Sequence, residues 1–328
     1  MVIQMEKFVD YYEIVKKGFP GQYSDRHALG AFLCLLENHF REKELTQKDI
    51  DNSWSIIKKK VRVTSAFRDY LKLPLILKMA MSDDPEQYLN GIIKTYELIK
   101  ATFFTGSGQR LLTAMAIYEN TQNDQINEIC SAMYDLYYRM KKEHPILTGQ
   151  EDMIFAALLA MDREKHNDLI REIEECYDLL RKKFRHSMSP IQNVSHILAL
   201  TDQLPEEKTE KFIALYETLK EEKEKTEIGP HLIVLAVLSI LDITVDLAAE
   251  EVSKMDAFLK EQKGFHRLGV SSHDRRLIAT AITAADHLPK ENRMINGVNV
   301  ALLKTILSTS MMSAIITTQS SFAMSGHK

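Results

Sequence analysis

A period of about forty residues runs through most of this chain and constrains its fold more than any other feature. Tyrosines recur at intervals of 41, 40 and 39 residues, at Tyr96, Tyr137, Tyr177 and Tyr216. An apolar residue follows each tyrosine three positions later, and Trp54 stands 42 residues before Tyr96 as an earlier copy of the same position. Such a period is typical of stacked helical hairpins, because one hairpin is too small to bury its own apolar face.

The two helices of each predicted unit differ in character. The first is apolar on nearly all sides, as in Ile154–Met161 and Leu232–Leu241, whereas the second carries one apolar stripe and a charged face, as in Glu172–Lys183. Since a helix that is apolar all round is buried, the first helices should form an inner layer and the second helices an outer one. We predict an all-α fold, an array of about seven helical hairpins with a period near 41 residues, as an α-solenoid or α/α superhelix. The period leaves open whether this superhelix is open or closes into a ring, and no run of residues predicts a strand.

We interpret residues 1–328 as a single helical-repeat domain with three parts. Residues 1–22 form an N-terminal cap with a helix at about 4–17, residues 23–310 hold the hairpin repeats, and residues 311–328 are a Ser/Thr-rich C-terminal segment. The predicted hairpins lie near 23–63, 64–104, 105–145, 146–186, 187–227, 228–269 and 270–310. Pro74 falls inside the apparent helix Phe67–Met81 and predicts a kink or a late helix start there.

The end of the chain has an unusual composition. No charged side chain occurs from Thr305 to Gly326, and the stretch is rich in Ser and Thr. We expect a final core helix that caps the stack. Two alternatives are membrane attachment, for which the many hydroxyls are unfavourable, and docking on another copy or a partner.

Composition limits the classes of function. A net charge of −4 gives no reason to expect a nucleic-acid partner, because phosphate binding requires a basic face. One short basic run is interpreted as a solvated helix end: Lys58, Lys59, Lys60 and Arg62. The three cysteines, Cys34, Cys130 and Cys176, form no C-x-x-C pair, which favours a reducing compartment. Charged residues interrupt any apolar N-terminal stretch, at Glu6, Lys7 and Asp10. We therefore expect a cytoplasmic protein without membrane association.

No catalytic or cofactor motif occurs in the sequence. It contains no G-x-S-x-G, H-E-x-x-H or P-loop, and Gly106-Ser-Gly108 lacks the third glycine of a dinucleotide fingerprint. The histidines are not grouped at metal-ligand spacing. We therefore assign no catalytic residue, no metal ligand and no cofactor.

One set of polar residues is a candidate binding site. The first helices should begin at the same end of the array, so that their opening residues line one rim. Arg26, Arg68 and Arg110 are spaced at 42 and 42 residues, and helix N-termini present free N–H groups that suit an anion. The candidate ligand-binding residues of this rim are Arg26, His27, Arg68, Arg110, His231, His273 and Arg276.

A structural interpretation of the rim competes with the functional one. Ser24, Ser65, Thr148 and Ser272 have the character of helix N-caps. The arginines could also pair with neighbouring acids such as Asp25 and Asp69. In that case the rim would serve only capping and local ion pairs.

Three segments resemble a bacterial family known only as a domain of unknown function. They are Gly106-Ser-Gly-Gln-Arg-Leu-Leu112, Leu147-Thr-Gly-Gln-Glu-Asp152 and the closing Ser/Thr-rich tail. The resemblance covers nearly the whole chain and implies no catalytic residue.

These observations favour an interaction scaffold for a protein or peptide partner, because helical repeats supply extended binding surfaces and seldom carry chemistry. The alternative is an enzyme or small-anion binder that uses the polar rim. The two are distinguished by whether the rim residues converge on a cavity or lie apart along an open edge.

Overall fold

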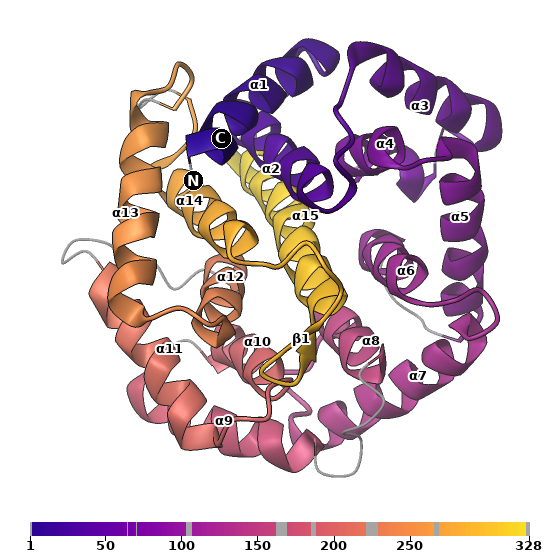
Figure 1. Cartoon of the computed structure of the whole chain (residues 1–328). Coiled ribbons are helices and arrows are strands. Elements are labelled where there is room, and N and C mark those ends of the chain that lie inside the picture. The colour runs from indigo at the N-terminus through magenta and orange to yellow at the C-terminus, as the bar shows by residue number, and fades with distance from the viewer. Residues whose placement is uncertain are drawn as a thin grey trace.

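Two concentric layers of helices form a ring around one central helix (Figure 1). The computed structural model describes residues 2–63, 65–69, 71–102, 107–161, 169–184, 188–220, 229–265 and 269–325. The outer layer consists of α1 (Val2–Gly18), α3 (Gln47–Lys60), α5 (Pro85–Thr102), α7 (Ile126–Glu143), α9 (Leu169–Lys183), α11 (Pro205–Leu219) and α13 (Val245–Glu261). The inner layer consists of α2 (Ser24–Arg41), α4 (Lys72–Met81), α6 (Ser107–Asn120), α8 (Met153–Met161), α10 (Met188–Leu198), α12 (Gly229–Ile240) and α14 (Ser272–Asp286).

The layering follows from the apolar pattern of each helix. In α8 every residue from Met153 to Ala160 is buried, whereas α9 buries one stripe, Leu169, Ile173, Cys176, Tyr177 and Leu180. A helix with one apolar stripe can face solvent with its other side. The all-α class predicted from the sequence is confirmed. Positions on or next to the inner helices are buried, as the predicted layering requires: Leu112, Met115, Phe155, Leu158, Ile197, Leu200, Val234, Leu238, Ile278 and Ile282.

The array closes on itself. Helix α14 packs against α2, and α12 packs against α14, so the last inner helix meets the first (Figure 1). The ends of the predicted repeat region are therefore neighbours in space. Of the two arrangements that the period left open, the structure has the closed ring.

The helices begin where local chemistry allows. Pro74 lies in the first turn of α4, where its missing N–H costs no intrahelical bond, so the late helix start is the correct alternative. Thr46 and Asp49 form a capping box at the start of α3. Ser65 caps the short 3₁₀ helix η1 (Ala66–Arg68), while the cap of α14 is Ser271 rather than Ser272.

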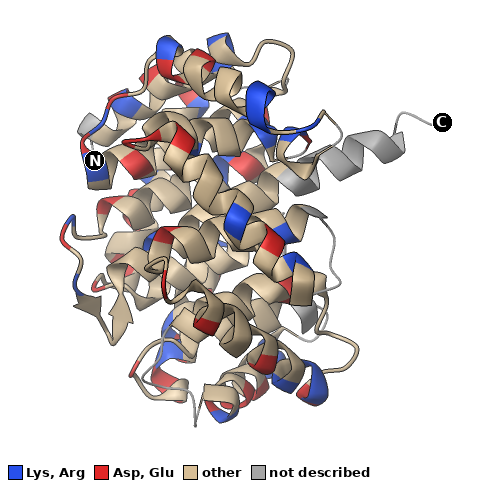
Figure 2. Ribbon diagram, turned by 90° about the vertical axis from the view of Figure 1, so that its right-hand side faces the viewer, with Lys and Arg blue, Asp and Glu red and all other residues tan. Residues whose placement is uncertain are grey.

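The segment after α14 differs from the prediction of a seventh hairpin. It forms a small antiparallel pair, β1 (Met294–Ile295) and β2 (Val298–Asn299), so the expectation of no strand was wrong here. Asn296 and Gly297 connect the strands with φ of 47° and 81°, the left-handed values of a tight hairpin turn. Figure 2 shows this hairpin at one mouth of the ring, and basic and acidic residues are interspersed over the side drawn.

The final helix, α15 (Val300–Ser325), occupies the centre of the ring (Figure 1). It packs against α2, α6, α12 and α14, and most of its residues from Val300 to Ile315 are buried. The hairpin before it is tied to the C-terminal ends of inner helices, since Asn296 Nδ2 donates to the Ile240 carbonyl at 2.6 Å. Helix α15 thus enters at that mouth and runs antiparallel to the inner layer. Within the described residues no helix is long and apolar enough to cross a membrane.

Candidate functional site

The repeated tyrosines lie on successive outer helices and are buried. Tyr96, Tyr137, Tyr177 and Tyr216 belong to α5, α7, α9 and α11, and each is at most 8% exposed. The Tyr96 hydroxyl accepts a hydrogen bond from Arg110 Nη1 at 3.0 Å. An aromatic residue at this position can therefore also contact the start of the next inner helix.

Three basic residues of the predicted rim follow such an aromatic residue by 14 positions. The pairs are Tyr12 with Arg26, Trp54 with Arg68, and Tyr96 with Arg110. The Arg68 and Arg110 guanidinium carbons lie 5.5 and 5.1 Å from the ring centroids of Trp54 and Tyr96, within the range of cation–π attraction. Tyr12 instead makes an edge contact with His27, with ring centroids 6.3 Å apart. Tyr12 extends the aromatic series by one unit beyond the copies that were predicted from the sequence.

The acids expected to neutralise the rim arginines have other partners or none. Asp25 accepts a hydrogen bond from the Ser271 backbone N–H at 2.9 Å instead of pairing with Arg26. Arg68 and Asp69 form no ion pair within the described part of the chain, although they are adjacent in sequence. The local ion-pair interpretation therefore does not account for Arg26 or Arg68.

The structure divides the seven candidate residues into three groups. His231 and His273 stack edge to face with centroids 5.6 Å apart, and Arg276 lines a small cavity of about 20 Å³ with His231. Arg110 lies against Tyr96. Arg26, His27 and Arg68 each contact a residue that lines a different and larger cavity at the beginning of the ring.

This larger cavity, the Trp54 pocket, has a volume of about 170 Å³. It lies between the loop that joins α1 to α2, the outer helix α3 and the inner helix α4. Its lining residues are Gly18, Phe19, Pro20, Gln22, Ile50, Asp51, Trp54, Lys72 and Ile76. Gly21, with φ of 86°, supplies the left-handed backbone that this connecting loop requires.

Two predicted rim residues hold the wall of the Trp54 pocket. Arg26 Nη1 donates to Gln22 Oε1 at 2.7 Å, and His27 Nε2 lies 2.9 Å from the Phe19 carbonyl oxygen. Burial lowers the pKa of His27 below its ordinary value, an effect that the Phe19 contact opposes. A neutral imidazole that bonds the loop carbonyl fixes the loop in place.

Positive charge gathers around Trp54. Besides Arg68, the Nζ atoms of Lys58 and Lys72 lie 5.3 and 5.2 Å from the centroid of its ring. None of these three cations forms an ion pair with a carboxylate in the described residues. Like charges this close repel one another, and nearby water only partly screens that repulsion.

Arg26 adds a fourth cation that is largely removed from water. It is 8% exposed, its Nε has no hydrogen-bond partner in the described structure, and burial lowers its pKa. The Arg68 Nε is likewise buried without a partner among the described residues. A buried guanidinium without a counter-ion is costly, so an anion here would remove an existing penalty.

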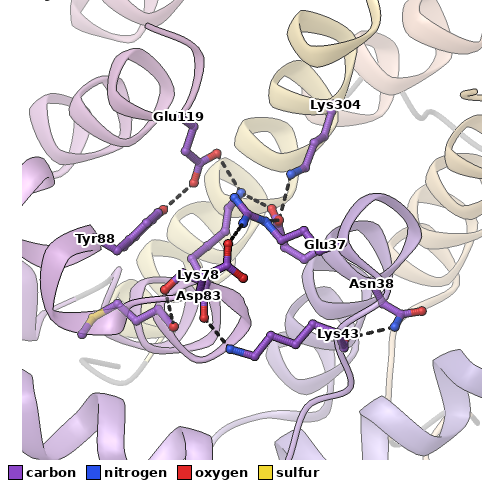
Figure 3. A network of polar contacts seen from close by, with 11 residues as sticks. Glu37, Asn38, Lys43, Lys78, Asp83, Tyr88, Glu119 and Lys304 are labelled. Atoms are coloured by element: carbon purple, nitrogen blue, oxygen red, sulfur yellow. Dashed lines mark hydrogen bonds and ion pairs between the residues drawn. The ribbon is translucent and has the colours of Figure 1, made fainter. Parts of the chain in front are cut away.

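A second polar cluster lies near the C-terminal ends of the inner helices α2, α4 and α6, where α15 begins, and its charges are all paired (Figure 3). Lys78 Nζ bonds Glu37 at 2.6 Å and Glu119 at 2.9 Å, and Lys304 of the central helix bonds Glu37 at 2.8 Å. Burial favours the neutral form of Glu37, but Lys78 and Lys304 outweigh it and hold the Glu37 pKa below its usual range. Tyr88 donates to the other oxygen of Glu119.

The paired cluster joins consecutive units to α15. Glu37, Lys78 and Glu119 stand 41 residues apart, at equivalent points of α2, α4 and α6. Because every one of these charges has a partner, the cluster has no unmet need for a ligand. We interpret it as the contact that fixes α15 in the ring.

Buried polar groups also occur in α10. His196 is 1% exposed, neither of its ring nitrogens has a partner in the described structure, and burial lowers its pKa to about 3. Gln192 Oε1, one turn earlier, is unpartnered as well. Among the residues that the structure describes, no group of three or more His, Cys, Asp or Glu could hold a metal ion.

Comparison with known proteins places the chain in a family. Residues 11–320 match the family described as "Protein of unknown function (DUF4003)". The chain is also 26% identical over 259 residues to "Uncharacterized protein YeaA" of Bacillus subtilis (strain 168), which covers 76% of this chain and 74% of that protein. No solved structure matches the chain. Since the family match spans nearly the whole ring and its central helix, this chain belongs to the DUF4003 family.

Proposed function

We propose that this protein binds a small anionic ligand at the Trp54 pocket. The observation that carries the proposal is the convergence of Lys58, Arg68 and Lys72 on one tryptophan, without a neutralising carboxylate among the described residues, beside a cavity. Pockets that bind small molecules combine an apolar lining with a few convergent polar groups. The ligand's charge would relieve the repulsion among the cations.

One acid lines the same pocket. Asp51 is exposed and accepts a hydrogen bond from Gln47 Nε2 at 3.1 Å. Its charge opposes that of an anion, although water screens an exposed carboxylate. Replacing Asp51 with Asn keeps its shape and removes this charge, so D51N should bind anions more tightly than the wild type.

Trp54 is the only tryptophan in the chain, so fluorescence excited selectively in tryptophan reports on this pocket. Titration with inorganic phosphate at low ionic strength should give a saturable change in Trp54 emission. The double variant R68Q/K72Q should weaken this binding by at least about tenfold, since hydrogen bonds to charged groups contribute about 1.5–3 kcal/mol each.

A matched control removes the same net charge elsewhere. Lys94 and Lys142 are exposed on α5 and α7, away from the pocket. K94Q/K142Q should leave the phosphate titration unchanged. Equal losses in the two double variants, or no saturable change with phosphate and carboxylates in the wild type, would refute the proposal.

A scaffold role is a second candidate, supported by a groove on the outer wall. It lies between α5 and α7, has a volume of about 420 Å³, and is lined without a charged side chain by Leu98, Ala101, Thr102, Asn127, Cys130, Ser131 and Tyr134. The exposed Tyr134 ring contacts the Tyr138 ring in a tilted arrangement, with centroids 4.5 Å apart. Exposed aromatic residues are enriched at protein interfaces.

This second candidate predicts a specific cross-link. A photoreactive residue in place of Ser131 should join a partner protein in extracts of the native host, and Tyr134→Ala should abolish the adduct. The same probe at exposed Lys94 is the control. Adducts of equal yield from both positions, or adducts that persist in Y134A, would count against the groove.

A further inference from the structure

The lining of the Trp54 pocket is more apolar than a bare anion requires. Five of its nine lining residues are apolar or aromatic, and Lys72 is the one cation that lines it directly: Phe19, Pro20, Ile50, Trp54 and Ile76. Inorganic ions are bound by polar groups alone, so this hydrocarbon surface would contribute nothing to holding one. The wall suits a ligand that has an apolar part.

The volume of the Trp54 pocket limits the size of the ligand's apolar part. An apolar cavity of about 150 Å³ holds a benzene molecule in a protein core, and the Trp54 pocket has about 170 Å³. Ile50 and Ile76 are at most 2% exposed, so their positions are fixed by the surrounding core. The space is therefore preformed for one small ring or a branched chain of similar volume.

The cations around Trp54 reach this space through Lys72. Lys72 belongs to both the pocket lining and the group around Trp54, whereas Lys58 and Arg68 reach the tryptophan without lining the cavity. A ligand with its ring against Ile50 and Ile76 would place an attached acidic group beside Trp54 and Lys72. The two halves of such a ligand would meet two different environments.

We infer that the ligand is a small organic anion, a carboxylate or phosphate ester that carries a hydrocarbon ring of about the size of benzene. This inference rests on the proposed function and names its ligand class. The ring removes apolar surface from water inside the pocket, and the acidic group neutralises the cations around Trp54.

The experiment is a Trp54 fluorescence titration with a matched set of probes: acetate, benzoate, inorganic phosphate, phenyl phosphate and benzyl alcohol. Benzoate should bind at least about tenfold tighter than acetate, and phenyl phosphate at least about tenfold tighter than phosphate, because ring burial adds to the charge contribution. Benzyl alcohol, which has the ring but no charge, should bind more weakly than benzoate. The two acid series tell a carboxylate ligand from a phosphate ligand.

Two variants separate the two parts of the pocket. Ile50→Phe enlarges a lining side chain into the cavity and should remove the preference for benzoate over acetate while acetate affinity is retained. Lys72→Gln should weaken acetate and benzoate by the same factor and leave their ratio unchanged. If I50F proves unfolded by circular dichroism, Ile50→Ala replaces it, and this enlarged pocket should favour 2-naphthoate over benzoate.

The outcomes distinguish the inference from the function on which it rests. Equal affinities of acetate and benzoate, and of phosphate and phenyl phosphate, would overturn the ring-bearing ligand and leave the anion site. Benzyl alcohol binding as tightly as benzoate would overturn the acidic group. No saturable binding by any anion would overturn the proposed function itself.

Discussion

Replacing Lys78 with methionine tests the paired cluster between the inner helices and the start of α15. The Lys78 side chain is 2% exposed and bonds two carboxylates, at 2.6 and 2.9 Å. Methionine keeps most of the volume and removes the charge. After the change Glu37 still has Arg41 and Lys304, whereas Glu119 keeps only the Tyr88 hydroxyl among the described contacts.

The expected cost follows from that difference. Removing one partner of a buried ion pair typically costs about 3–5 kcal/mol, because the other charge stays buried and unpaired. Only one of the two carboxylates loses its cation here, so we expect K78M to lower the free energy of unfolding by about 3 kcal/mol.

Urea unfolding followed by circular dichroism measures the change. K78M/E119Q should recover most of the loss, since glutamine accepts the Tyr88 hydrogen bond without a charge, and should differ from the wild type by about 1 kcal/mol. Lys94→Met, at an exposed site of α5, should stay within about 0.5 kcal/mol. A loss in K78M below about 1 kcal/mol, or a double variant no more stable than K78M, would refute the interpretation that Lys78 neutralises a buried carboxylate.

Three further predictions concern other parts of the ring. Burial holds the pKa of His196 at about 3 in the folded protein, below its value in the unfolded chain. As the pH falls below about 6.5 the unfolded chain takes up a proton first, so His196 lowers the free energy of unfolding by up to about 1.4 kcal/mol per pH unit. H196L should remove this contribution; urea stabilities of the two proteins that run parallel from about pH 7 to pH 5 would contradict the prediction. Gly297→Ala should lower the melting temperature by several degrees, because φ is 81° and the added Cβ would clash with the Asp202 carboxylate; an unchanged thermal scan would mean that the hairpin contributes little. Leu238→Ala should cost about 2–5 kcal/mol in urea unfolding, since Leu238 is fully buried on α12 and leaves a cavity; a loss well under 1 kcal/mol would place it at the surface.

The helix class and the two layers were predictable because they depend on local pattern. An apolar run such as Met153–Ala160 has to be buried wherever it lies, and the single stripe of α9 has to face it. Closure into a ring was not predictable from the period. It depends on the small rotation between one unit and the next, and no single residue in the sequence determines that rotation. The contact of α14 with α2 is visible only in the structure.

Two features of the fold have signals in the sequence that the prediction of seven hairpins did not include. Asn296-Gly297 is a strong hairpin signature, but its strands of two residues are too short to give an alternating pattern. Glu37, Lys78 and Glu119 place a charge at the same point of three apolar helices, 41 residues apart. A charged residue inside an inner helix predicts a buried residue of opposite charge beside it. The 41-residue period indicates where on the neighbouring helices that residue would be found.

The candidate site was predictable in part. The matched spacing of Arg26 and Arg68 indicated the part of the ring in which the Trp54 pocket lies, because equivalent positions of neighbouring units lie close together. The Trp54 pocket itself depends on the loop Gly18–Gln22, whose backbone path no repeat position specifies. Lys72 was not singled out, since only the folded loop brings it and Trp54 to one cavity.

The filled centre of the ring bears on where any ligand can bind. Helical repeats usually offer a concave inner surface, but here α15 occupies that space and Lys304 anchors it to Glu37. Binding must then use the rims or the outer wall. At the rim, an aromatic residue that stands 14 positions before an arginine can contact its guanidinium group, as Tyr96 does for Arg110. Trp54 differs because three cations share one ring beside a cavity, and this excess of charge is why the first units of the ring are the place to look for a ligand.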